Sequence, residues 1–279
     1  MKYVKQLHQI DKNDTPRAGG KAASLGELMK AGVAVTPGFV ILTNAFEWWT
    51  TRKTEIPSAV AQEIQTSFQS LGSSFVAVRS SATAEDSTSA AWAGMLATSL
   101  YTTKDTLLEH VKDCWASLSS ARALAYRMKK GAKENILVAV VIQKMIESEK
   151  SGTAFSVHPV THDNNQLIIE AGWGLREAIV SGQITPNSYV VDKRSRQIVD
   201  KRTPPQSRAL YRRKNGGIKW RTITGKQRAQ QVLSDREIVE LSEIILRIED
   251  HFGFPCDIEW AFENGNFYIL QSRPITTLS

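Results

Sequence analysis

Four polar residues near the end of the chain have types and spacing that suit phosphate chemistry. Asp257 and Glu259 stand in a segment that alternates polar and apolar residues, so they share one face of a predicted strand. Gln271 and Arg273 have the same spacing on the next predicted strand. Carboxylate and amide oxygens suit Mg²⁺, and an arginine can neutralise a transferring phosphoryl group. The alternative interpretation is a salt-bridge cluster on an exposed sheet.

The turn between these two strands decides which face each polar residue takes. A two-residue Asn264-Gly265 turn puts Gln271 on the apolar side, whereas a three-residue loop, Glu263–Gly265, puts all four polar residues on one face. We expect the three-residue loop because it separates polar from apolar residues more cleanly. It would turn five residues to the core: Ile258, Trp260, Phe262, Tyr268 and Leu270.

Two earlier segments could also bind an anion. Gly19-Gly20-Lys21 is not a Walker motif, because Ala22 stands where Ser or Thr would hold Mg²⁺. Arg79 ends a predicted strand, and the small residues after it would let backbone N–H groups approach an anion. The ordinary alternatives are a surface lysine and a mobile polar loop.

The elements that must position these residues mix helical and strand periodicities. Lys21–Ala31 has a helical pattern, and Ile136–Ile146 predicts a long buried strand. Ser234 and Glu237 form a capping box that opens the last helix, and Gly253 closes it. The mixture predicts an α+β or α/β fold.

The composition is that of an ordinary globular protein, with 279 residues, 42% of them hydrophobic and 23% charged. The longest apolar run, Ile136–Ile142, is far shorter than the roughly 20 residues of a membrane-spanning helix. The start lacks an apolar signal core, so we expect a cytoplasmic protein without a membrane partner. Cys114 and Cys256 belong to no CxxC motif and predict neither a disulfide framework nor a zinc site.

The net charge of +7 is concentrated in one segment. Asp192–Arg228 contains thirteen Lys or Arg and two Asp residues, which gives +11 and leaves −4 for the rest (7 − 11). This segment could hold an acidic partner, or it could form a solvated hairpin near a polyphosphate. Tyr211 and Trp220 are its only aromatic residues, so a nucleic-acid-binding protein is disfavoured.

Several spaced motifs together resemble the N-terminal domain of the phosphoenolpyruvate synthase, pyruvate phosphate dikinase and rifampicin phosphotransferase family. The motifs are Gly19–Leu28, Val78–Asp86 followed by Ala93-Gly94, Ser151–Ser156, Asp257–Trp260 and Leu270–Pro274. The resemblance extends from about residue 3 to residue 277. Their shared order is far more specific than any single motif.

The resemblance implies an α+β ATP-grasp fold, in which two lobes clamp ATP. We expect residues 1–279 to form one such nucleotide-binding module, with lobes of approximately 1–190 and 191–279. The implied cofactors are ATP and Mg²⁺.

The resemblance also assigns roles to the matching residues. The residues that would act on the phosphates are Lys21, Arg79 and Arg273. Those in the loop that closes over the phosphate chain would be Gly94 and Thr98. The adenine hinge would consist of Gln143, Lys144, Met145 and Ile146. The metal would be held by Glu259 and Gln271 with support from Asp257, and Glu170 would approach the ribose.

In this family the module phosphorylates a histidine on a separate swivelling domain. None of the five histidines here lies in a Ser-His-Ala segment, so we expect no phosphohistidine domain within residues 1–279. The chain would then be an incomplete phosphotransferase whose partner is a phosphohistidine domain elsewhere. The alternative is a catalytically silent nucleotide-binding regulatory module.

Three places depart from the usual motifs. Met95 and Leu96 replace polar residues, which would weaken contacts near the phosphates. Arg176 replaces a glycine, which would alter packing near the ribose, and Asn187 replaces a common Asp. We still expect ATP binding, because the metal pair and both basic residues are present.

Overall fold

The computed structural model describes residues 2–52, 55–84, 96–121, 123, 125 and 136–275. The chain forms two compact units, each built on its own sheet. Unit 1 comprises Met1–Lys30 and Thr36–Met145, and unit 2 comprises Ala31–Val35 and Ile146–Ser279. Within the described residues, no helix is both long enough and apolar enough to cross a membrane.

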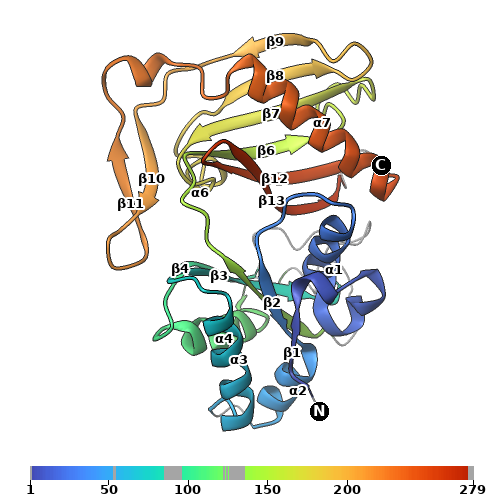
Figure 1. The fold of residues 1–279 in the computed structure, drawn as a ribbon, viewed down its shortest axis with the longest axis vertical. Coiled ribbons are helices and arrows are strands. Elements are labelled where there is room, and N and C mark those ends of the chain that lie inside the picture. Colours follow the sequence, from blue (N-terminus) through green and yellow to red (C-terminus); the bar gives the residue numbers. More distant parts are fainter. Residues whose placement is uncertain are drawn as a thin grey trace. The chain divides into compact units, whose positions relative to one another are not determined.

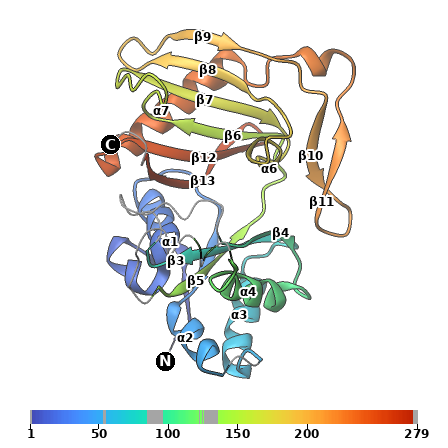
Figure 2. The same cartoon turned by 180° about the vertical axis from the view of Figure 1, so that it is seen from behind.

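Unit 1 contains an antiparallel sheet with strand order β1-β2-β5-β3-β4 (Figure 1). Its strands are β1 (Val4–Gln6), β2 (Gly38–Ile41), β3 (Val76–Ala82), β4 (Thr98–Thr102) and β5 (Val138–Lys144). Its helices are η1 (Leu7–Gln9), η2 (Lys12–Asp14), α1 (Thr15–Lys30), α2 (Thr43–Arg52), α3 (Ser58–Ser70) and α4 (Leu107–Ser117). Helix α1 covers one face of this sheet, and α2, α3 and α4 lie on the other (Figures 1 and 2).

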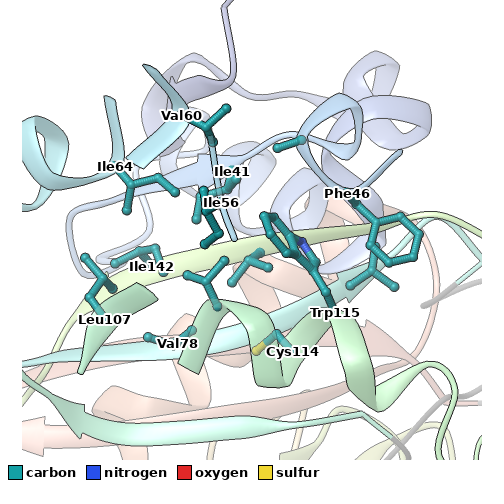
Figure 3. Close-up of a cluster of buried hydrophobic side chains, with 14 of the residues drawn as sticks. Ile41, Phe46, Ile56, Val60, Ile64, Val78, Leu107, Cys114, Trp115 and Ile142 are labelled. Carbon is teal, nitrogen blue, oxygen red and sulfur yellow. The ribbon is translucent and has the colours of Figure 1, made fainter. Parts of the chain in front are cut away.

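The alternation of β3 and β5 makes one face of this sheet apolar. Val78 pairs with Ile142, and both side chains enter a buried cluster with Trp115 and Cys114 of α4 (Figure 3). Successive residues of a strand point to opposite faces. Arg79 therefore projects from the face that α1 covers.

Unit 2 contains an antiparallel sheet with strand order β13-β12-β6-β7-β8-β9. Its strands are β6 (Lys150–Phe155), β7 (Gln166–Trp173), β8 (Asn187–Asp192), β9 (Ile198–Arg202), β12 (Cys256–Glu263) and β13 (Asn266–Pro274). A separate two-stranded ribbon consists of β10 (Arg208–Arg212) and β11 (Ile218–Thr222). Its helices are α6 (Glu177–Val180), η3 (Gly225–Ala229) and α7 (Asp235–Phe252).

Helix α7 crosses one face of the unit 2 sheet (Figure 1). The predicted capping box of Ser234 and Glu237 is confirmed, and Gly253 closes the helix in the left-handed conformation that favours glycine. Lys150 on β6 donates a hydrogen bond to Glu237 at 2.6 Å, which fixes the side of the sheet that α7 covers. Trp260 projects from the same side and is fully buried.

The two units meet in sequence at Met145–Ile146, not near residue 190 as expected. The physical reason is hydrogen bonding, because β6, β7 and β8 join the same sheet as β12 and β13. The short segment Ala31–Val35 belongs to unit 2 for the same reason, since Ile269 N donates to the carbonyl of Ala34 at 2.8 Å. The α+β class is confirmed.

The turn between β12 and β13 differs from the expected three-residue loop. Glu263 pairs with Asn266, so Asn264 and Gly265 form a two-residue turn with φ values of 50° and 79°. The polar residues nevertheless share one face, because the pairing shifts by one residue between Glu259 and Trp260.

This irregularity has a consequence for the core. The side chains of Phe267 and Ile269 are buried, whereas Tyr268 and Leu270 are only partly buried. The expectation for Tyr268 and Leu270 was therefore wrong. The expectation for Ile258, Trp260 and Phe262 is confirmed, since all three are buried.

Candidate functional site

A row of polar side chains crosses the unit 2 sheet on the face opposite α7. Direct cross-strand partners run in the order Gln271, Glu259, Thr153, Glu170 and Ser188 over five adjacent strands. Such partners project from the same face of a sheet. Thr153 Oγ1 donates a hydrogen bond to Glu170 Oε2 at 3.0 Å. The row thus gathers carboxylate, amide and hydroxyl oxygens on one surface.

Two arginine–carboxylate pairs lie at the β12 end of this row. Arg273 pairs with Asp257 across the two strands, and its Nε and Nη2 atoms donate to Asp257 Oδ2 at 2.9 and 2.6 Å. Burial raises the pKa of Asp257 above its ordinary value of 3.8, although the nearby Arg273 opposes that rise. Arg176 Nη2 lies 3.1 Å from Glu259 Oε2. The charges of these two carboxylates are therefore compensated within the protein.

The donor set at Glu259 and Gln271 suits Mg²⁺. The two residues are direct partners on neighbouring strands, and both offer the hard oxygen ligands that Mg²⁺ prefers. Among the described residues, no group of three or more His, Cys, Asp or Glu side chains could hold a metal ion. An ion at Glu259 and Gln271 would therefore take further oxygens from water or a bound phosphate, as is usual for Mg²⁺.

In unit 1, the start of α1 lies close against the end of β3. Gly19 interrupts the helix with φ 77°, and a Cβ atom placed there would come within 2.2 Å of the carbonyl oxygen of Ser81. Only glycine permits this approach. Ser81 Oγ accepts a hydrogen bond from Ala22 N at 3.2 Å. Lys21 is buried there, and its Nζ donates to the carbonyl of Ser80 at 2.7 Å.

A second cation of unit 1 lies on the same face of the sheet. Arg79 Nη1 donates to Gln143 Oε1 at 3.3 Å, and Gln143 Nε2 donates to Thr36 Oγ1 at 3.2 Å. All three side chains are buried. Thr98, expected in a loop, is the first residue of β4 and pairs with Arg79, while Gly94 lies outside the described residues.

The expected adenine hinge coincides with the passage between the units. Gln143 and Lys144 end β5, Met145 is the last residue of this part of unit 1, and Ile146 begins the long part of unit 2. The backbone N–H groups of Lys144 and Met145 donate to the carbonyls of Pro37 and Phe75. The structure thus groups the expected residues by unit. Unit 1 holds Lys21, Arg79, Thr98, Gln143, Lys144 and Met145, and unit 2 holds Ile146, Glu170, Asp257, Glu259, Gln271 and Arg273.

Residues 49–279 match the family described as pyruvate phosphate dikinase, AMP/ATP-binding domain. The chain belongs to this AMP/ATP-binding domain family. The resemblance seen in the sequence motifs is thereby confirmed.

The chain is similar to three longer curated proteins. It is 34% identical to phosphoenolpyruvate synthase of Pyrococcus furiosus, with 99% of this chain and 44% of the relative covered. It is 37% identical to a probable phosphoenolpyruvate synthase of Methanothermobacter thermautotrophicus, with 100% and 46% covered. It is also 37% identical to rifampicin phosphotransferase of Bacillus subtilis, with 98% and 36% covered. The chain thus spans less than half the length of each of these relatives.

Among solved structures, this AMP/ATP-binding domain is similar to D-alanine-D-alanine ligase from Helicobacter pylori. The TM-score is 0.43 at 9% sequence identity, and 94% of this chain and 55% of the ligase chain are covered.

Two residues of this AMP/ATP-binding domain were not assigned to the site from the sequence. Arg176 was noted only as a replacement for glycine that would alter packing near the ribose, yet it contacts Glu259. Thr153 lies between Glu259 and Glu170 in the polar row. The alternation of Ser151, Gly152, Thr153 and Ala154 could have indicated Thr153, since its hydroxyl shares a face with that of Ser151. No local pattern could have paired Arg176 with Glu259.

Proposed function

We propose that the chain binds ATP together with Mg²⁺ and transfers a phosphoryl group to a histidine on a separate domain, as an ATP-grasp module. The observation that carries this proposal is the direct pairing of Glu259 with Gln271 beside the Arg273–Asp257 pair. Membership of an AMP/ATP-binding domain family supports the nucleotide. Glu259 and Gln271 would hold Mg²⁺, which would neutralise part of the charge on the phosphates.

Each expected residue would then contact a particular part of ATP. Lys21 and Arg79 of unit 1 would bind phosphate oxygens, and Arg273 of unit 2 would neutralise charge on the transferring group. Asp257 positions Arg273 through two hydrogen bonds to one oxygen. Gln143–Ile146 would meet the adenine, and Glu170 would reach the ribose.

The transfer itself needs little covalent chemistry from this chain. A bond between a phosphorus of ATP and a bridging oxygen breaks, and the electron pair leaves with the remaining nucleotide. A nitrogen of the acceptor imidazole forms the new bond to phosphorus. The contribution of these residues is positioning and charge stabilisation, as in other phosphoryl transfers.

Calorimetry with purified protein tests the nucleotide site. We expect ATP binding that requires Mg²⁺ and is lost in Glu259→Ala and in Arg273→Ala. Glu240→Ala is the matched control, because Glu240 is an exposed carboxylate on α7, which covers the opposite face of the sheet. Equal ATP affinity in the wild type and both site variants would refute the site assignment.

A labelling experiment separates the proposed enzyme from a silent regulatory module. The chain is incubated with Mg²⁺, ATP labelled in its β- and γ-phosphates, and a separately produced phosphohistidine domain from a phosphoenolpyruvate synthase. Transfer predicts label on that domain that is stable in base and released by acid. Binding of ATP without label on any candidate domain would favour the regulatory module.

A further inference from the structure

We propose that Arg176 is an internal counter-ion for Glu259 that a divalent cation must displace before it can bind. This inference deepens the proposed function, because it concerns the expected metal ligand. It makes metal binding a competition between Mg²⁺ and a guanidinium of the same chain. The consequence is that this protein needs more free Mg²⁺ than a variant without the arginine.

The contact between Arg176 and Glu259 is close and shielded from water. Arg176 Nη2 lies 3.1 Å from Glu259 Oε2, and the two side chains are 16% and 12% exposed. Charge attraction is stronger in such a setting than at an open surface, where ion pairs contribute little. A cation that binds Glu259 must therefore replace an existing favourable contact.

The turn that carries Arg176 is held in place by its backbone. Gly174 has φ 72°, and a Cβ atom there would lie 2.2 Å from the carbonyl oxygen of Leu210. Gly174 N donates to the carbonyl of Glu149, and Leu175 N donates to the carbonyl of Leu210, each at 2.9 Å. These hydrogen bonds fix the backbone next to Arg176, which keeps its guanidinium near Glu259.

The local charge balance points to the same conclusion. Asp257 and Glu259 supply two negative charges, and Arg176 and Arg273 supply two positive charges within the same cluster. These four residues sum to zero, so they offer a divalent cation no excess negative charge. Withdrawal of Arg176 from Glu259 would free one carboxylate beside the amide of Gln271.

Calorimetric titration with Mn²⁺ alone, a spectroscopically useful substitute for Mg²⁺, tests the competition without any activity measurement. We expect Arg176→Ala to bind Mn²⁺ about tenfold more tightly than the wild type, the equivalent of one moderate ion pair. Arg176→Lys keeps a positive charge and should stay within about threefold of the wild type. In the double variant Arg176→Ala/Glu259→Gln, the gain should disappear.

The matched control is Lys193→Ala. Lys193 Nζ lies 2.6 Å from Glu249 Oε2 of α7, and the two side chains are 14% and 18% exposed. This pair resembles the Arg176–Glu259 pair in burial but belongs to the face of the sheet that α7 covers. Its removal changes the net charge equally and should leave the affinity for Mn²⁺ unchanged.

Three results would overturn the inference. They are equal Mn²⁺ affinity in the wild type and Arg176→Ala, no Mn²⁺ binding by either protein, and an equal gain in Lys193→Ala. Circular dichroism confirms that each variant is folded. The proposed function fails by a different result, an absence of ATP binding at saturating Mg²⁺. In that case the comparison of Mn²⁺ affinities still tests the role of Arg176.

Discussion

The polar faces of the two sheets hold their cations in different ways. In unit 1, Lys21 donates to a backbone carbonyl and Arg79 donates to an amide oxygen, and both acceptors are neutral. In unit 2, Arg176 and Arg273 face the carboxylates of Glu259 and Asp257. A phosphate that replaces a neutral acceptor gains charge attraction at once, whereas one that approaches a paired arginine competes with a carboxylate. The arginines of unit 2 must therefore exchange a carboxylate partner before either of them can bind a phosphate.

A substitution at the close contact between α1 and β3, which positions the unit 1 cations, should have the largest effect. Gly19→Ala places a Cβ atom 2.2 Å from the Ser81 carbonyl oxygen at a positive φ, so we expect a loss of about 3 kcal/mol in the free energy of unfolding. Equilibrium unfolding in urea measures this loss. Gly72→Ala is the control, because Gly72 also has a positive φ but meets no atom within 4 Å, and the strain alone costs about 1 kcal/mol. Equal losses in the two variants would show that the close contact is unimportant.

The difference between the cations themselves can be tested by varying the Mg²⁺ concentration. Arg79→Met should lower ATP affinity about 30-fold at both low and saturating Mg²⁺, a change of about 2 kcal/mol, because it removes a charge that needs no metal. Glu259→Gln should lower the affinity mainly at low Mg²⁺, because a high metal concentration offsets the weakened metal ligand. Calorimetry under both conditions measures the two effects. If both variants depended on Mg²⁺ in the same way, the contrast between the faces would be wrong.

One buried thiol in each unit provides a smaller test of how independent the units are. Burial raises the pKa of Cys114 in unit 1 to about 11 and that of Cys256 in unit 2 to about 12. Only the thiolate reacts, so at pH 8 a disulfide reagent should label each cysteine only after its own unit opens. Cys114→Ser and Cys256→Ser variants separate the two rates. Rapid labelling of the folded protein at pH 8 would contradict the assigned burial.

The raised pKa values of the same two thiols also make the stability of the folded protein depend on pH. The unfolded chain loses each thiol proton near the ordinary pKa of 9.0, whereas the folded protein keeps it until about pH 11 or 12. The folded state therefore binds more protons in this window, and its stability falls as the pH rises above 9.

The terminal hairpin shows which features of the site could be predicted from the sequence and which could not. Period-two alternation correctly predicted that Asp257, Glu259, Gln271 and Arg273 share one face. The expected loop was wrong, because Asn264 and Gly265 both adopt positive φ and close a two-residue turn. An irregularity in pairing, which depends on the packing of neighbouring strands, then restored the shared face.

The boundary between the two units also could not be predicted from the sequence. The expected boundary between the lobes lay near residue 190. The observed boundary at Met145–Ile146 follows from the hydrogen bonds that join β6–β8 to β12 and β13. Such long-range pairing leaves no local signal, because each strand pattern is compatible with several partners.

The sequence by itself determined the family, the capping of α7, and the polar face of the last two strands. Each of these depends on residues that are neighbours in the chain and obey a local period or cap geometry. Only the tertiary structure decided that Arg176 meets Glu259, and that Gly19 brings Lys21 against β3. These contacts join residues far apart in sequence, and their geometry is set by sheet pairing and close backbone packing.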